Sequence, residues 1–411
     1  MRAPGLSVRR AVPEQNPGVD PRIHASFLVM DCRVKPGNDE PTNMPIFTPH
    51  QDSALKAVAG WLEAKPGRGA PQVFRLFGYA GTGKTTLAKH IAQNVDGKVL
   101  FGAFTGKAAS VMRSKGCEGA TTIHGMIYQA YDVGEETPSF DLWHEGPAAK
   151  AKLIVIDECS MVDAELGGDL LSFGAPVLVL GDPAQLPPIQ GGGFFTAAEP
   201  DAMLTEVHRQ ACDDPIVHLS MEVRAGRRLA PGRYGLTEVA RRGDFDPQRA
   251  LEADQILVGR NATRRAYNAR MRERRGLADA LPVAGDKLVC LRNNRRKGLF
   301  NGSLWLVEER KTSRARTLRL RLKAEEAILS RSVKASVRPE CFLGGIEAFE
   351  WRERKRYDEF DFGYVLTVHK AQGSQWDDVV LFDESFAFPD SRERWLYTGI
   401  TRAAKRLTVV V

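Results

Sequence analysis

Residues 73–86 read Val-Phe-Arg-Leu-Phe-Gly-Tyr-Ala-Gly-Thr-Gly-Lys-Thr-Thr, and a helical pattern follows directly. The last nine residues fit the pattern G-x-x-x-x-G-K-[ST], in the strand–turn–helix setting that this pattern requires. Glycines let successive backbone N–H groups curl around phosphates, and the N-terminus of the following helix adds positive partial charge. The stretch therefore predicts a binding site for a nucleoside triphosphate.

The side chains of this loop have distinct predicted roles. Lys84 can reach the β- and γ-phosphates, and the Thr85 hydroxyl can ligate Mg²⁺. The other loop residues expected to contact the nucleotide are Gly78, Gly81, Thr82, Gly83 and Thr86. A glycine-rich turn that binds nothing is the alternative, and the Lys and Thr in place after a strand argue against it.

Two further apolar runs end in polar residues. Residues 153–158 form an apolar strand pattern that ends in two acids. Asp157 can enter the Mg²⁺ shell, and Glu158 can orient and deprotonate the attacking water. Residues 177–185 form another strand and turn, in which the Gln185 amide can sense a γ-phosphate. Taken alone, that last loop is better explained as a proline-stiffened turn.

Short apolar strands alternate with helical patterns from Met44 onward, and continuous β-branched runs are typical of strands buried on both faces of a parallel sheet. The first group is Val73–Phe77, Val99–Phe104, Leu153–Ile156 and Val177–Leu180, and the second is Gln255–Gly259, Tyr364–Val368, Val379–Phe382 and Leu407–Val411. Two α/β units are therefore predicted. Residues 284–360 instead show short alternating strands, which indicates a β-rich insertion in the second unit.

Composition narrows the function classes. The 411 residues are 43% hydrophobic and 27% charged, as is ordinary for a globular protein. The six cysteines form no C-x-x-C pair, so neither a disulfide framework nor a zinc site is indicated. The apolar runs fall short of the roughly 20 residues that a membrane-spanning helix requires. We expect a cytoplasmic protein without membrane contact.

The distribution of charge favours a polyanionic partner. The net charge is +7, and residues 286–360 alone contain 19 Lys and Arg against 11 Asp and Glu. A basic surface of this kind suits a nucleic-acid backbone. Solvated charge alone would explain the pattern equally well.

Residues 1–43 differ from the rest. They contain six prolines and little periodicity, which predicts a disordered tail. Parts of the segment resemble translated repeat DNA at misplaced gene starts, so we expect Met44 to be the natural start.

The motifs together resemble those of superfamily 1 helicases. The matching segments are residues 78–86, 157–158, 181–185, 367–373 and 397–403. Within this superfamily, the chain resembles the RecD-like and phage Dda-like 5′→3′ DNA helicases in two features. One is its compactness, and the other is the order of its segments 104–109, 121–124 and 157–161. The resemblance covers Met44 to Val411.

This resemblance implies an α/β fold of two RecA-like P-loop domains with parallel sheets. Residues 44–205 would form the first motor domain, with a hairpin insertion, the pin, at about 125–150. Residues 206–283 and 361–411 would form the second motor domain. Residues 284–360 would form an SH3-like β insertion in the second domain.

The resemblance also implies ATP and Mg²⁺ as cofactors and adds residues to the site. Gln51 would hold the adenine, Gly373 would contact the nucleotide, and Arg209 and Arg402 would act as arginine fingers. A finger of this kind contributes roughly 10³–10⁵ in rate in NTPases. The implied catalytic set is Lys84, Glu158, Gln185, Arg209 and Arg402, and the implied metal ligands are Thr85 and Asp157.

The implied contacts with DNA follow the same kinship. Residues matching the single-strand track are Thr105, Lys107, His124, Thr367, His369 and Lys370. An aromatic of the pin, Phe140 or Trp143, could stack on the last base pair, with an energy of about 1–3 kcal/mol per base. Each of these residues could instead be a capping or packing residue.

The implied activity is that of an ATP-dependent DNA helicase moving 5′→3′ on single-stranded DNA and opening forked duplex. The protein would be a monomer and could work with single-strand-binding, repair, recombination or replication proteins. Two alternatives stay open: a RecD-type subunit of an exonuclease complex, and a DNA-stimulated ATPase that remodels protein–DNA complexes without unwinding.

Overall fold

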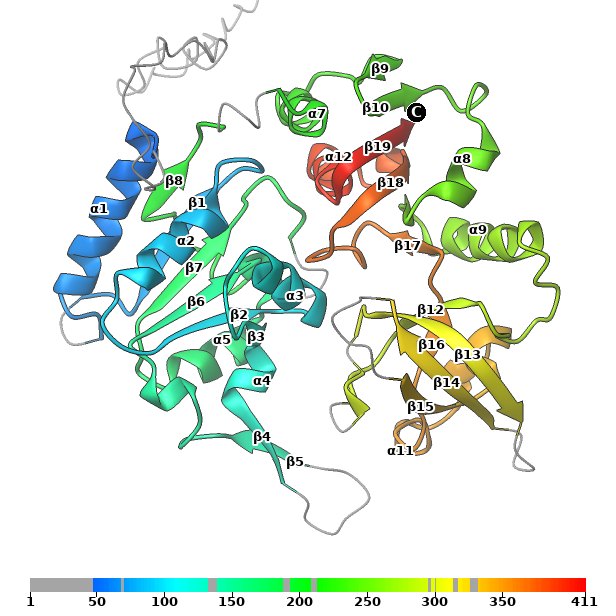
Figure 1. The fold of residues 1–411 in the computed structure, drawn as a ribbon, viewed down its shortest axis with the longest axis horizontal. Coiled ribbons are helices and arrows are strands. Elements are labelled where there is room, and N and C mark those ends of the chain that lie inside the picture. The colour runs from blue at the N-terminus through cyan, green and yellow to red at the C-terminus, as the bar shows by residue number, and fades with distance from the viewer. Residues whose placement is uncertain are drawn as a thin grey trace, which may run out of the picture. The chain divides into compact units, whose positions relative to one another are not determined.

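The first group of apolar runs forms one parallel sheet (Figure 1). The computed structural model describes residues 47–67, 70–131, 139–187, 193–207, 213–294, 297–299, 301–312, 317–325 and 332–411, which all fall in the unit Pro45–Val411. The predictions of a disordered tail at 1–43 and of a start at Met44 lie outside these ranges.

The strand order of the first sheet is β3-β2-β6-β7-β1-β8, and every neighbouring pair is parallel. Its strands are β1 (Val73–Gly78), β2 (Val99–Ala103), β3 (Thr121–Thr122), β6 (Leu153–Asp157), β7 (Val177–Gly181) and β8 (Ala202–Leu204). All five residues of β7 are buried, as expected for a strand covered on both faces.

Helices cover both faces of this sheet because alternate strand residues point to opposite sides. One core cluster joins Leu76 and Leu178 to residues of the first three helices, which are α1 (Pro49–Glu63), α2 (Lys84–Gln93) and α3 (Gly106–Ser114). The opposite cluster joins Phe77 and Val179 to α4 (Ile123–Ile127) and α5 (Ala164–Leu171).

The second group of apolar runs forms a second sheet, in the order β17-β11-β18-β19-β10-β9, which is parallel except for its edge strand β9. Its strands are β9 (Gly232–Tyr234), β10 (Thr237–Ala240), β11 (Gln255–Val258), β17 (Val365–Thr367), β18 (Trp376–Phe382) and β19 (Ala403–Val410). One face packs on α7 (Pro215–Arg224) and α12 (Arg392–Ile400), and the other packs on α8 (Pro247–Glu252) and α9 (Asn261–Arg274).

Residues between α9 and β17 form an antiparallel sheet in the order β15-β14-β13-β12-β16. Its elements are β12 (Lys287–Cys290), β13 (Leu304–Thr312), β14 (Leu318–Ala324), β15 (Ser332–Val337), α10 (Glu340–Leu343), α11 (Trp351–Arg354) and β16 (Phe360–Phe362). In β14 every second residue is buried, which is why the sequence alternates there. A separate hairpin, β4 (Tyr128–Tyr131) and β5 (Ser139–Leu142), extends from the first sheet's unit.

The predicted α/β fold with two parallel sheets, a hairpin and a β-rich insertion is confirmed, and the predicted strands match observed strands within a few residues at each end. The name SH3-like and the domain boundaries stay predictions. Much of the insertion's positive charge is used internally, since Arg292, Lys297, Arg338 and Arg354 all pair with acids there.

A buried ion pair fixes the insertion to α9. Asp286 is fully buried and accepts hydrogen bonds from both Nε (2.9 Å) and Nη2 (3.0 Å) of Arg272, from the Val283 N–H and from the Tyr364 hydroxyl. Removing one partner of such a pair leaves an uncompensated buried charge.

We therefore expect Asp286→Ala to lower the free energy of unfolding by about 3–5 kcal/mol in urea denaturation. The control is Glu222→Gln, which removes a surface pair with Arg227 and should leave the urea midpoint nearly unchanged. Equal midpoints for Asp286→Ala and the wild type would contradict this account of how the insertion is held.

Candidate active site

Three neighbouring strands of the first sheet end at one place. The order β6-β7-β1 brings together Asp157, Gly181 and Gly78 at the carboxyl edge, where open α/β sheets bind ligands. A cavity of about 540 Å³ lies there. Residues of the second sheet's unit also line it, namely Gly373, Ser374, Gln375, Thr401 and Arg402. The cavity is therefore walled from both sides.

The phosphate loop has the shape that its sequence predicts. Gly81 and Gly83 have φ of +77° and +81°, a region that L side chains rarely adopt, and α2 begins directly afterwards at Lys84. The Lys84 Nζ donates to the carbonyls of Gly78 (2.7 Å) and Tyr79 (3.0 Å). The cation and the N-terminus of α2 thus face one concave turn, which is a built anion site.

The two predicted metal ligands lie together. The Thr85 hydroxyl donates to Oδ2 of Asp157 at 3.1 Å. Burial, and secondly the neighbouring Glu158, raise the pKa of Asp157, so this carboxylate is short of compensating positive charge. A hydroxyl and one carboxylate beside a phosphate loop fit Mg²⁺, which usually takes one or two protein oxygens and completes its shell with phosphates and water. Consistent with so few protein ligands, the described residues contain no group of three His, Cys, Asp or Glu side chains arranged to hold a metal.

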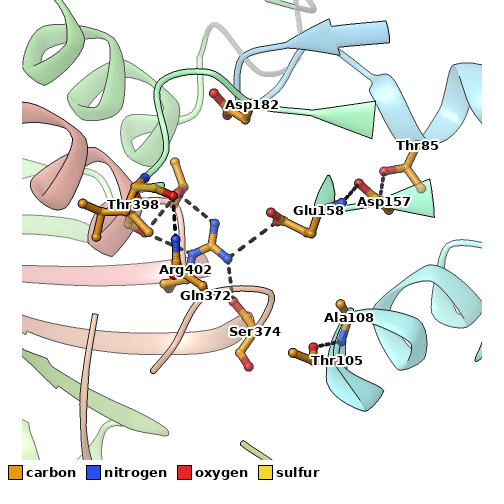
Figure 2. A network of polar contacts seen from close by, with 12 residues as sticks. Thr85, Thr105, Ala108, Asp157, Glu158, Asp182, Gln372, Ser374, Thr398 and Arg402 are labelled. Atoms are coloured by element: carbon orange, nitrogen blue, oxygen red, sulfur yellow. Dashed lines mark hydrogen bonds and ion pairs between the residues drawn. The ribbon is translucent and has the colours of Figure 1, made fainter. Parts of the chain in front are cut away.

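Glu158 has an unusual backbone. Its φ of +53° and ψ of +45° place a non-glycine residue in the left-handed region. Conformations of this kind are costly and occur mostly where function requires a side chain to point in one direction. The turn sends the Glu158 carboxylate toward the second sheet's unit, where its Oε1 lies 3.7 Å from Nη1 of Arg402 (Figure 2).

Arg402 is held rigidly, since its residue is only 3% exposed. Its Nε donates to the Thr398 carbonyl (3.0 Å), Nη1 to the Ser374 carbonyl (3.2 Å) and Nη2 to the Thr401 hydroxyl (3.2 Å). Figure 2 shows the guanidinium between these groups and Glu158. The orientation of the arginine is thus set by hydrogen bonds within its own unit.

The Gln185 side chain contacts both Glu158 and Arg402. In the amide orientation that satisfies both of its polar atoms, the nitrogen donates to Oε2 of Glu158 (3.1 Å) and the oxygen accepts from Nη2 of Arg402 (3.2 Å). The loop that could have been only a stiff turn therefore brings an amide into the centre of the site. Three of the five predicted catalytic residues, Glu158, Gln185 and Arg402, form one connected cluster, and Lys84 lines the same cavity.

Gln51 has a different role in this structure from the one implied by kinship. Its Oε1 accepts from the Thr48 N–H (3.0 Å) in a capping box at the start of α1, and its Nε2 donates to the Thr82 carbonyl (3.0 Å). The amide therefore stabilises the phosphate loop from behind. Adenine binding by Gln51 stays a prediction, and it would require the amide to exchange these partners. Arg209 lies outside the described residues.

Most residues predicted to face DNA gather in a second cavity of about 260 Å³. Thr105, Lys107, His124, His369 and Lys370 line it. Thr367 does not, and its hydroxyl instead accepts from the Lys370 N–H (3.3 Å). The Thr105 hydroxyl also caps α3. Burial lowers the pKa of His369 and of Lys370, so the histidine ring is neutral at pH 7.

The predicted pin aromatics are less informative. Trp143 is half-buried just beyond the end of β5, where its backbone N–H donates to the Ile127 carbonyl (2.7 Å), so it lies at the base of the hairpin. The side chain of Phe140 and residues 132–138 lie outside the described part. Strand separation by either ring stays a prediction.

Sequence reasoning missed several residues that line or support these cavities. Asn293 and Asn301 bring the β insertion to the second cavity, which is predicted to face DNA, and the Lys370 Nζ donates to the Asn301 side chain at 2.6 Å. Tyr397, Thr398 and Ser374 contact site residues from the second unit. A signal existed for three of these residues, because Tyr397 and Thr398 lie in the segment 397–403 and Ser374 directly follows the segment 367–373. No local pattern distinguishes the two asparagines.

Known proteins resemble the chain in both halves. A family model described as an AAA domain matches residues 68–247, and one described as a UvrD-like helicase C-terminal domain matches residues 362–410. The ATP-dependent RecD2 DNA helicase of Deinococcus radiodurans is 30% identical over 359 residues, covering 80% of this chain and 46% of that protein. The ATP-dependent DNA helicase dda of Enterobacteria phage T4 is 31% identical over 165 residues, covering 36% of this chain and 37% of that protein. The chain thus spans less than half the length of these relatives.

Solved structures share the fold. A structure of Pif1 helicases at forked double-stranded DNA has a TM-score of 0.54 at 17% identity, covering 90% of this chain and 92% of that one. Pif1 helicase from Bacteroides in complex with ADP-AlF3 and single-stranded DNA has a TM-score of 0.52 at 17% identity, covering 89% and 92%. At such identities the likeness extends to the fold alone.

The position of Glu158 predicts a separation of binding from turnover. Glu158→Gln keeps the size of the side chain and removes the base, so ATP hydrolysis should fall by about 10²–10⁴-fold while nucleotide affinity changes little. Steady-state phosphate release and binding of a fluorescent nucleotide measure the two. Glu165→Gln, at an exposed position on α5, is the matched control. Turnover within a few-fold of wild type in Glu158→Gln would remove this residue from the chemistry.

Proposed function

We propose that the chain is a superfamily 1 helicase of the RecD and Dda type, an ATP-dependent DNA helicase that moves 5′→3′ on single-stranded DNA. The observation that carries the proposal is the cluster of Glu158, Gln185 and Arg402. It joins the two sheets' units across the phosphate loop. A nucleotide clamped there is in contact with both motor units.

The residues divide the chemistry among them. The loop N–H groups and Lys84 bind the phosphates, and Thr85 with Asp157 would hold Mg²⁺, which supplies charge neutralisation on the phosphate oxygens. Glu158 takes the proton of the attacking water. Arg402 stabilises the charge that spreads over the transferred phosphoryl group. Gln185 holds the Glu158 carboxylate and the Arg402 guanidinium in position relative to each other by hydrogen-bonding to both.

Conversion of hydrolysis into movement follows from the same geometry. Arg402 and Gln185 line the cavity from the two units, so a γ-phosphate bound between them would strengthen the connection of the units and its release would weaken it. The DNA-facing cavity has residues from both units and from the β insertion, so such a movement would change its grip on a strand. Hydroxyls, amides and amines suit phosphate contacts that do not depend on sequence.

Polarity and partners rest on kinship. We propose single-stranded DNA and forked duplex as ligands, a monomeric state, a cytoplasmic location, and service in replication, recombination or repair. In the described part of the chain, no helix has the length and apolar character needed to cross a bilayer.

The proposal is tested by comparing the unwinding of two duplexes, one with a 5′ single-stranded tail and one with a 3′ single-stranded tail. With ATP and Mg²⁺, strand release should depend on the 5′ tail. Lys84→Ala should abolish ATP turnover and unwinding while single-strand binding largely persists. Dependence on the 3′ tail would contradict the polarity, and DNA-stimulated hydrolysis without strand release would favour the remodelling ATPase. Normal turnover in Lys84→Ala would refute the phosphate-loop assignment.

A further inference from the structure

Helix α12 touches the phosphate loop through one side chain. The Tyr397 hydroxyl accepts a hydrogen bond from the Ala80 N–H (2.8 Å) and donates one to Oδ2 of Asp182 (2.7 Å). Ala80 belongs to the phosphate loop, and Asp182 follows β7. Tyr397 is 1% exposed, so both hydrogen bonds are formed away from water. A hydroxyl of the second unit therefore helps to set the position of the phosphate loop in the first.

Neighbouring residues of α12 strengthen this connection. The Thr398 hydroxyl accepts from the Leu186 N–H (2.9 Å), next to Gln185, and the Thr398 carbonyl accepts from Arg402. Contacts with the phosphate loop, with the loop that carries Gln185 and with the arginine thus come from two consecutive helix residues.

The same helix also reaches the DNA-facing cavity. The rings of His369 and Phe388 have centroids 5.1 Å apart, and Phe388 stacks on Trp395 of α12 at 5.8 Å with an interplanar angle of 12°. His369 lines the cavity, and Trp395 is fully buried. A series of three rings therefore connects the cavity wall to α12.

Close packing makes the connection stiff. A Cβ atom added at Gly399 of α12 would lie 2.8 Å from Leu381 and 3.3 Å from Val368, the residue before His369. The helix cannot shift toward β17 and β18 without displacing them. At its other end, withdrawal of Tyr397 would deprive the buried Asp182 of a donor, which is costly. A small displacement of α12 at the phosphate loop would therefore also displace the residues around the cavity that His369 lines.

We propose that α12 couples occupancy of the DNA-facing cavity to ATP hydrolysis, with the Tyr397 hydroxyl as its positioning contact on the phosphate loop and the His369–Phe388–Trp395 rings as its contact with the DNA track. The inference rests on the proposed function. Burial, together with Asp182, holds the pKa of Tyr397 well above its ordinary value, so the hydroxyl keeps its proton and remains a donor at neutral pH.

Two conservative variants test the two ends. Tyr397→Phe keeps the ring and removes both hydrogen bonds, and Phe388→Leu keeps an apolar side chain and breaks the ring series. The first readout is the ratio of ATPase rates with and without saturating oligo(dT). The second is the change in oligo(dT) affinity caused by a non-hydrolysable ATP analogue. By linkage this change equals the change in analogue affinity caused by oligo(dT), so it measures the coupling between the two binding sites directly. Thermal melting checks that each variant is folded.

The matched control is Tyr364→Phe. Tyr364 is also buried and donates to a carboxylate, Asp286 at 3.0 Å, but its hydroxyl contacts the β insertion and not the phosphate loop. Both test variants should lose about 5-fold or more of the stimulation ratio and of the affinity change, whereas the control keeps them. Since the two contacts act in series, the double variant should lose no more than the worse single variant.

The possible failures are distinguishable. A wild-type protein whose hydrolysis does not respond to DNA would overturn the proposed function and this inference with it. Normal stimulation in the wild type, with equal stimulation and an equal affinity change in Tyr397→Phe, would overturn the inference alone. Additive losses in the double variant would contradict a single path through α12.

Discussion

The site depends on the contacts that the buried Arg402 guanidinium makes with Glu158 and Gln185. Three hydrogen bonds from its own unit fix its orientation, and the remaining contacts go to Glu158 and Gln185 of the other unit. A buried cation is costly without compensating partners, and here Glu158 and Gln185 of the other unit supply them. The proposed dependence of ATP hydrolysis on both units follows from this position of Arg402.

The electrostatics of the cavity suit an anionic ligand with a metal. Asp157 is half-buried and Asp182 is buried, desolvation raises the pKa of each, and Glu158 lies beside Asp157. Lys84 and Arg402 supply positive charge from opposite walls. Phosphates would satisfy the two cations and the loop N–H groups, and a divalent ion would satisfy the carboxylates. The site is therefore balanced for a metal nucleotide rather than for either part alone.

Local patterns predicted much of this arrangement. The continuous apolar runs before Gly78, Asp157 and Gly181 predicted strands, and parallel pairing necessarily brings their ends to one edge. The loop motif predicted glycines whose N–H groups curl around phosphates, and two of them, Gly81 and Gly83, have positive φ. Family kinship was needed for Arg402, which is distant in sequence from the loop and reaches it only through the packing of the second sheet.

Other features depend on tertiary context and were not predicted. The capping box that engages Gln51 uses a Thr three residues earlier, and nothing local shows that its amide also reaches Thr82. The positive φ of Glu158 has no signal in the local sequence. Asn293 and Asn301 of the β insertion line the cavity predicted to face DNA, and Asn301 accepts a hydrogen bond there from Lys370 of the second unit, which short-range sequence patterns do not encode.

The most direct measurement is ATP turnover by Arg402→Ala together with its affinity for a non-hydrolysable nucleotide. If the arginine acts across the two units on the transferred phosphoryl group, turnover with saturating DNA should fall by roughly 10³–10⁵-fold while affinity changes far less. Near-normal turnover would contradict the account, because the nucleotide would then be hydrolysed without the second unit.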